Sequence, residues 1–284
     1  MSARALASQG AKVFITGRRL PVLQGAVQAH NADVGKHGGE LIPIQMDVSD
    51  KQSLQDGVSK VTQQAGKLHI LINNAGVEGP VTKFTPDDFN KGDDDEIKRA
   101  TLYAQRQWDN EQFQDWDSVF KANTHAVHFT SLAFLPLLVK GNADPPTKHK
   151  QNVDKFNKWT ASIINITSIS GLVHIAQNHY AYNASKAAAN SLTRMLAHEL
   201  KFSVGANVRV SACCPGLVTT EMTTKKSSLE SGGQSSINDL DPTMSNPAGR
   251  VGLEEDIAQA ILLLAANLFI TGVVLPVDGG FVTA

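Results

Sequence analysis

The stretch SIINITSISGLVHIAQNHYAYNASKAAANSLTRMLAH, residues 162–198, decides how the rest of the chain is interpreted. Its beginning, residues 163–167, is apolar and rich in β-branched side chains, which is typical of a buried strand. The helical pattern that follows carries Tyr182 and Lys186 four residues apart, so phenol and ammonium group share one helix face. A nearby ammonium group favours the phenolate and is therefore expected to lower the pKa of Tyr182, which suits acid–base work. Ser168, after the strand, could hold a substrate oxygen against the phenol.

Strands and helices alternate along the rest of the chain. We expect strands near residues 12–16, 41–46, 68–72, 163–167, 208–213 and from 272. Helices are expected near 21–35, 51–65, 116–139 and 260–266, with a further one that carries Tyr182 and Lys186. This alternation predicts an α/β fold, in which a doubly wound parallel sheet forms the middle of three layers. The notable motifs follow strand ends, where open parallel sheets bind their ligands. We expect one domain, residues 1–284, with polar insertions at about 79–118 and 141–158 and a substrate loop at about 220–247.

Together these motifs resemble the short-chain dehydrogenase/reductase family of the classical type, which pairs a Tyr-x-x-x-Lys helix with a Ser on the preceding strand. The resemblance covers nearly the whole chain and implies a Rossmann-like fold. It also implies an oxidoreductase that interconverts a secondary alcohol and a ketone by hydride transfer. The spacing between Ser168 and Tyr182 is one residue longer than is usual in the family, which leaves Ser170 as an alternative.

The resemblance assigns four catalytic residues. Tyr182 would be the general acid/base, and Lys186 would lower its pKa and bind the nicotinamide ribose. Ser168 would hydrogen-bond the substrate oxygen. Asn123 would support a water molecule in a proton relay, although an Asn inside a helix can equally make a structural hydrogen bond.

The resemblance also assigns a dinucleotide site. Arg18 stands where NAD-preferring members carry an acidic residue, and because a guanidinium group attracts a 2′-phosphate we favour NADP over NAD. Asp47 would contact adenine, although an Asp after a strand can also cap a helix. The NNAG-like sequence 73–76 could alternatively be a plain turn. The expected cofactor-binding residues are Arg18, Asp47, Val48, Asn74, Ala75, Gly76, Tyr182, Lys186, Pro215, Gly216, Val218 and Thr220.

The beginning of the chain departs from the family pattern. Family members start with a strand and a glycine-rich turn that holds the pyrophosphate at a helix N-terminus, whereas this sequence starts inside the helix that follows. The absent strand would lie between the strands of Val13 and Leu71. About five buried aliphatic side chains amount to roughly 10 kcal/mol, comparable with a typical domain's stability. We expect an incomplete gene model, which the genomic sequence upstream of Met1 would test.

Composition is that of an ordinary soluble globular protein of 284 residues, with 42% hydrophobic and 19% charged residues and a formal net charge of −1. Nothing in it indicates a nucleic-acid partner. No signal peptide is expected, and the apolar segment 260–277 is interrupted, so we expect a cytoplasmic protein without a membrane span. The cysteines Cys213 and Cys214 are adjacent in a strand, point to opposite faces, and are expected to be core residues.

Other interpretations remain open. No metal is expected, because His125 and His128 have no obvious third ligand and the sequence His198-Glu199 is not followed by the second His of a zinc-protease motif. A partner is expected in the form of a small carbonyl or alcohol substrate. The resemblance further implies a homodimer or homotetramer. The alternative function is a cofactor-defective, non-catalytic interaction protein. The acidic segment 79–118 is expected to be a solvated surface insertion; as alternatives, it could contact another protein or cover the substrate.

Overall fold

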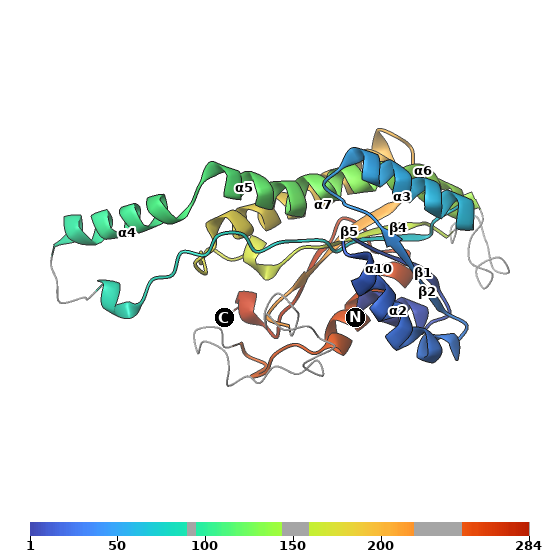
Figure 1. Ribbon diagram of the computed structural model, residues 1–284, viewed down its shortest axis with the longest axis horizontal. Coiled ribbons are helices and arrows are strands. Elements are labelled where there is room, and N and C mark those ends of the chain that lie inside the picture. Colours follow the sequence, from blue (N-terminus) through green and yellow to red (C-terminus); the bar gives the residue numbers. More distant parts are fainter. Residues whose placement is uncertain (90–94, 144–158, 219–245, 284) are drawn as a thin grey trace.

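The computed structural model of the chain describes residues 1–89, 95–143, 159–218 and 246–283, which form layers of helices around parallel strands (Figure 1). The strands are β1 (Lys12–Gly17), β2 (Glu40–Gln45), β3 (Ile70–Asn73), β4 (Ser162–Ile166), β5 (Arg209–Pro215) and β6 (Val274–Val277). The helices are α1 (Ser2–Ala7), α2 (Leu20–Gly35), α3 (Lys51–Ala65), α4 (Glu96–Asn110), α5 (Phe113–Phe120), α6 (Ala126–Ala143), α7 (Tyr180–Phe202) and α10 (Glu254–Ala266). The α/β, Rossmann-like fold expected from the sequence is confirmed.

Each strand of the sheet serves two hydrophobic cores because successive side chains point to opposite faces. In β4, Ile163 packs into the core shared with α3, α6 and α7, whereas Ile164 packs against α1 and α10 on the other face. Both side chains are fully buried. Cys213 joins the second of these cores and Cys214 lies in a separate cluster with Ile169, so the two thiols are buried, free and directed apart.

The sheet is interrupted between β1 and β3. Within the described residues, β1 pairs only with β2, while β3, β4, β5 and β6 form a second sheet in that order, and all pairs are parallel. In the described parts of the chain, no strand joins β1 to β3. Val13 of β1 and Ile72 of β3 nevertheless pack against the same hydrophobic core beneath α1 and α10.

The main correction to the predicted elements concerns the helix expected over residues 116–139. It is divided into α5 and α6 by a π-helical turn, η2 (Lys121–His125), which carries Asn123. A continuous apolar pattern does not reveal one extra residue in a turn, because the same side chains still reach the core. π-turns are frequent at functional sites.

The first insertion contains the helix α4, which Figure 1 shows extending away from the layered body beyond α5. None of its residues is buried, as expected for a surface insertion. The short helix η1 (Pro86–Phe89) lies against it. Most of the second insertion, residues 144–158, and nearly all of the predicted substrate loop lie outside the described residues.

Candidate active site

Ser168 is placed at the carboxyl end of β4 by a tight turn. It begins the short helix η4 (Ile169–Gly171), where its hydroxyl oxygen accepts a hydrogen bond of 3.1 Å from the backbone N–H of Ser170. The Ser168 side chain also hydrogen-bonds the Tyr182 side chain. The alternative, Ser170, donates its hydroxyl to Gln177 Oε1 at 2.8 Å. The structure therefore brings Ser168, and not Ser170, to the phenol.

The turn after Ser168 packs directly on the helix that carries Tyr182 and Lys186. A side chain at Gly171 would place its Cβ 2.6 Å from the backbone nitrogen of Ala187, so only glycine permits this contact. One helical turn separates Tyr182 from Lys186, and the Lys186 ammonium nitrogen lies 5.5 Å from the centre of the Tyr182 ring. The Ser, Tyr and Lys side chains thus meet at one strand end, as the sequence predicted.

The direction of the Tyr182 pKa differs from the sequence prediction. Burial raises this pKa because it penalises the charged phenolate; the Ser168 hydrogen bond lowers it less, and the negative charge of Glu78 raises it further. The expected lowering by Lys186 is therefore wrong for this arrangement. Desolvation outweighs the favourable neighbours and keeps Tyr182 in its protonated, proton-donating form.

Lys186 is itself buried, with 4% of its surface exposed. Its ammonium group donates a hydrogen bond of 3.1 Å to the carbonyl oxygen of Ile166, at the end of β4. Burial lowers the pKa of Lys186 to about 8, an effect that the nearby Cys214 partly opposes. A Cβ added at Gly76 would lie 3.3 Å from this nitrogen, so the glycine that follows β3 allows its loop to pass close to the ammonium group.

Asn123 connects the loop after β3 to the catalytic helix. Its side-chain oxygen accepts from the Val77 N–H at 2.8 Å, and its amide group donates to the Val77 carbonyl at 2.9 Å and to Ser185 Oγ at 3.0 Å. It is almost fully buried, with 1% exposed. The structural role left open from the sequence is therefore present, and the relay water stays a prediction.

The expected adenine end of the site lies after β1 and β2. Arg18 is exposed. Asp47 accepts hydrogen bonds from the hydroxyl and N–H of Ser49, which lower its pKa, and the charge of Arg18 lowers it further. The helix-cap alternative for Asp47 does not hold, because Asp50 caps α3 through the N–H of Ser53 at 2.7 Å. Val48 packs against the core under α3.

The expected nicotinamide end follows β5. A Cβ at Gly216 would lie 2.7 Å from the Cα of Asp278, so this position requires glycine for close packing of two strand ends. Pro215 ends β5, and the buried Val218 forms an isolated bridge with Gly252. Asn74 and Ala75 are exposed at the end of β3. Thr220 lies outside the described residues.

The described residues suit a dinucleotide at both the expected nicotinamide end and the expected adenine end of the site. The Lys186 ammonium group has three N–H donors, and Ile166 is its acceptor in the described part of the chain, which leaves donor capacity for ribose hydroxyls. The exposed guanidinium group of Arg18 suits a phosphate at the other end. The glycine-rich turn that would hold a pyrophosphate has no counterpart among the described residues.

Two features of the site could not be found from side-chain patterns. The acceptor for Lys186 is a backbone carbonyl, and the partner of Asn123 is the backbone of Val77. Backbone groups carry no residue-specific signal. In the described residues, no group of three or more His, Cys, Asp or Glu side chains could hold a metal ion, and no helix combines the length and apolarity needed to cross a membrane.

Comparison with protein families and curated proteins identifies similar chains. Residues 1–231 match the family described as short chain dehydrogenase. Over 290 aligned residues the chain is 34% identical to a short-chain dehydrogenase/reductase, PhomF, of Diaporthe leptostromiformis, covering 99% of this chain and 86% of that protein. It is 30% identical to the galactitol 2-dehydrogenase (L-tagatose-forming) of Cereibacter sphaeroides, covering 98% of this chain and 88% of that protein.

A 3-oxoacyl-[acyl-carrier-protein] reductase, FabG, of Thermotoga maritima is 28% identical over 86% of this chain and 78% of its own length. Among solved structures, the Pseudomonas aeruginosa RhlG/NADP active-site complex superimposes with a TM-score of 0.71 at 26% identity. That match covers 99% of this chain and 90% of the RhlG chain.

Proposed function

The chain belongs to the short-chain dehydrogenase/reductase family, which is a family of oxidoreductases. We propose that it interconverts a secondary alcohol and a ketone with NADP(H). The observation that carries this proposal is the meeting of Ser168, Tyr182 and Lys186 at the end of β4. In the direction of reduction, Ser168 donates a hydrogen bond to the carbonyl oxygen and Tyr182 gives that oxygen its proton. The bound dinucleotide supplies the hydride.

The pKa directions suit this division of roles. A buried, protonated Tyr182 is ready to donate a proton, and the Lys186 ammonium group stabilises the phenolate left behind once that proton has moved. Lys186 also has donors for ribose hydroxyls. We include Asn123 as the residue that would support a relay water, since its bonds to Val77 hold the loop beside Lys186.

The preference for NADP over NAD rests on Arg18. Its exposed guanidinium group follows β1, at the position where a carboxylate would repel a 2′-phosphate. A guanidinium group would instead attract this phosphate. The similar RhlG structure is a complex with NADP, which supports the same preference. Asp47, Val48, Asn74, Ala75, Gly76, Pro215, Gly216, Val218 and Thr220 complete the proposed cofactor site.

The proposal is tested by replacing Tyr182 with Phe and measuring carbonyl reduction with NADPH over a panel of ketones. We expect turnover to fall by roughly 10²–10⁴-fold, the usual contribution of a general acid, while NADPH binding changes little. Retained turnover would remove Tyr182 from the mechanism. Parallel assays with NADH test the cofactor preference.

The interrupted sheet favours a second candidate function. If a strand and phosphate-binding turn are missing between β1 and β3, the chain would be a cofactor-defective relative that acts through protein contacts. Titration of the protein with NADPH, followed by fluorescence, separates the two candidates. Saturable binding excludes the cofactor-defective alternative, and absence of binding excludes the enzyme.

The assembly and location that we propose follow the family resemblance. We propose a cytoplasmic homodimer or homotetramer that packs through the helices of Asn123 and Tyr182. Phe129 and Leu132 on α6 and Met195 on α7 are exposed in the single chain and would be covered by such packing. Light scattering of the purified protein tests this: a monomer at micromolar concentration would contradict it.

A further inference from the structure

The segment between Ser168 and Tyr182 contains a strained backbone. We call residues 172–179 the approach loop, because they join the Ser that would hold the substrate oxygen to the helix that would protonate it. Gln177 and Asn178 have φ angles of 54° and 65°, in the left-handed region that side chains other than glycine rarely adopt. Two such residues in succession persist only where surrounding contacts hold them.

Three of these contacts are hydrogen bonds from Ser170 and Asn183, in the neighbouring catalytic elements. Ser170 donates its hydroxyl to the Gln177 side chain. Asn183, on the first turns of α7, donates its amide group to the carbonyl oxygens of Ile175 at 2.9 Å and Ala176 at 3.1 Å. These bonds hold the middle of the approach loop and leave the carbonyl of Asn178 to another partner.

That partner is the first insertion. The backbone N–H of Thr82 donates a hydrogen bond of 2.9 Å to the carbonyl oxygen of Asn178. Thr82 is itself fixed, with 2% of its surface exposed. Its hydroxyl donates to Glu111 Oε1 at 2.9 Å and accepts from the Asn110 amide at 2.8 Å. The other Glu111 oxygen accepts from the indole N–H of Trp116, on α5, at 2.8 Å.

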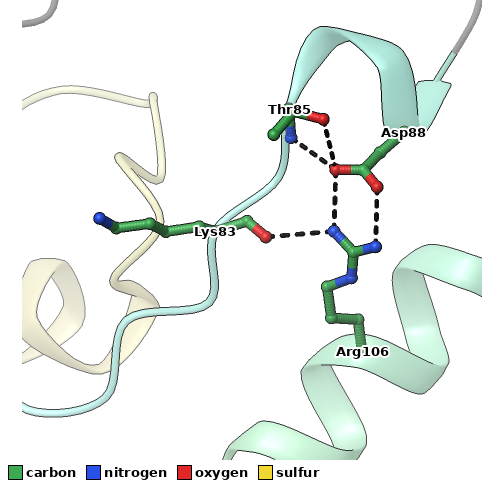
Figure 2. Close-up of polar contacts among 4 residues, drawn as sticks. All are labelled: Lys83, Thr85, Asp88 and Arg106. Carbon is green, nitrogen blue, oxygen red and sulfur yellow. Dashed lines mark hydrogen bonds and ion pairs between the residues drawn. The ribbon is translucent and has the colours of Figure 1, made fainter.

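The rest of the insertion is fastened to the same region. We call residues 81–89 and 95–111 the arm. Figure 2 shows Arg106 of α4 forming a two-pronged ion pair with Asp88, at 2.8 and 2.7 Å, and donating to the carbonyl oxygen of Lys83. Tyr103 of α4 hydrogen-bonds the hydroxyl of Tyr180, the first residue of α7.

We propose that the arm braces the approach loop, and that Thr82 and Glu111 are positioning residues for the substrate. The Thr82–Glu111–Trp116 chain of hydrogen bonds ties the helix leading to Asn123 to the backbone just before Tyr182. The arm thereby fixes the edge of the site that a substrate must pass. The positioning of a substrate rests on the proposed function, whereas the brace itself is a property of the folded chain.

Hydrogen–deuterium exchange tests the brace without cofactor or turnover. Replacing Thr82 by Val removes the hydroxyl and keeps the shape, whereas Thr82→Ser keeps the hydroxyl. We expect roughly tenfold faster exchange of the residue 82 and His179 amides in T82V, because their bonds to Asn178 and Ala176 open more often. T82S should match the wild type. Unchanged exchange in a folded T82V, or equal effects in both variants, overturns the brace.

Two further variants guard against a general loss of folding. Glu111→Gln leaves one acceptor oxygen for the two donors and should reproduce the T82V effect. Gln105→Ala is the matched control, since it removes only an exposed pair with Asp109 within α4. Exchange at residue 82 should not change in Q105A. An equal change in Q105A would mean that any disturbance of the arm has this effect, and would overturn the role of Thr82 and Glu111.

Steady-state kinetics test the positioning role. We expect T82V and E111Q to raise KM for the ketone by several-fold with a change in kcat below about twofold, because the site edge is loosened while Tyr182 keeps its neighbours. Unchanged KM with faster exchange would overturn the positioning role and leave a purely structural brace. A wild-type chain without turnover would instead refute the proposed function, and the exchange experiment would still decide the brace.

Discussion

Burial governs the ionisation of both titratable groups at the centre of the site. It holds Tyr182 in the phenol form and lowers the pKa of Lys186 to about 8. Side-chain spacing along the helix predicted that these residues lie together, because the helical period places residues four apart on the same face. The direction of the Tyr182 pKa could not be predicted in this way, since it depends on how much of the protein covers the phenol.

The lowered pKa of Lys186 predicts a specific pH dependence of stability. Between pH 8 and the ordinary value of 10.5, the unfolded chain binds a proton that the folded chain has lost, so stability rises with pH. The slope is at most about 1.4 kcal/mol per pH unit. The measurement is urea unfolding of the wild type and Lys186→Met at pH 8 and 9.5, and the wild type should gain relative to the variant.

The comparison with Lys186→Met is needed because the buried thiols act in the opposite sense. Burial raises the pKa of Cys213 to about 12 and also that of Cys214, so the unfolded chain loses these protons first and stability falls above pH 9. Both proteins share the loss from Cys213, which cancels in the difference, whereas the loss from Cys214 cancels only in part because the charge of Lys186 lowers the pKa of Cys214 in the wild type. Parallel stability curves for the two proteins would show that Lys186 titrates at its ordinary pKa.

The two serines after β4 give the second residue-scale prediction. The Ser168 side chain is hydrogen-bonded to Tyr182, whereas the Ser170 hydroxyl donates a hydrogen bond to Gln177. Ser168→Ala should lower kcat by roughly 10²–10³-fold, the usual effect of removing a donor to the reacting oxygen. Ser170→Ala should lower kcat by less than about tenfold. The reverse order of effects in a ketone reduction assay would exchange the two roles.

At the scale of secondary structure, regular elements were predictable and their interruptions were not. The helix α3 begins and ends at the residues expected, because Asp50 caps its start and Gly66 adopts a left-handed conformation at its end. The π-turn at Asn123 was not predicted, because burying one side of a helix leaves the same apolar pattern with or without an extra residue. The fold of the arm depends on pairs such as Asp88 and Arg106, which lie 18 residues apart in the chain.

The ion pair of Asp88 and Arg106 predicts how the arm is held. Hydrogen bonds from Arg106, together with those from Thr85, hold the pKa of Asp88 well below its usual range. The pair therefore stabilises the arm above the ordinary carboxyl pKa and persists as pH falls, until the lowered pKa is reached. Replacing Arg106 by Ala should allow faster proteolysis within residues 81–111, with little change in the melting temperature of the body.

Arg106→Lys is the matched variant for the arm. It keeps the positive charge but loses the planar, two-pronged contact and the stacking of the guanidinium group on Phe84. Proteolysis of this variant should fall between those of the wild type and Arg106→Ala. Identical cleavage of all three proteins would show that the pair does not hold the arm, as is common for exposed ion pairs.

For the whole molecule, hydrophobic patterning correctly predicted the layered α/β architecture, and the motifs at strand ends do lie at one edge of the strands, where the site itself stays a prediction. The order of strands follows from the pattern only where sequential strands pair, as β3, β4, β5 and β6 do. The relation between β1 and β3 depends on contacts between segments far apart in the chain. The absence of a central strand stays a prediction, and the divided sheet makes it testable on the protein itself.

Deuterium exchange at alternate amide groups of β3 tests whether the sheet is interrupted between β1 and β3 in solution. In a parallel pair, one strand bonds its neighbour through every second residue, and the remaining groups point to the opposite edge. If that edge is unpaired, the amides of β3 that do not face β4 should exchange with deuterium as fast as loop amides, while those that face β4 stay protected. NMR-detected exchange on the wild-type chain resolves the two sets. Equal protection of both sets would mean that a strand occupies the position between β1 and β3 in solution and that the sheet is continuous.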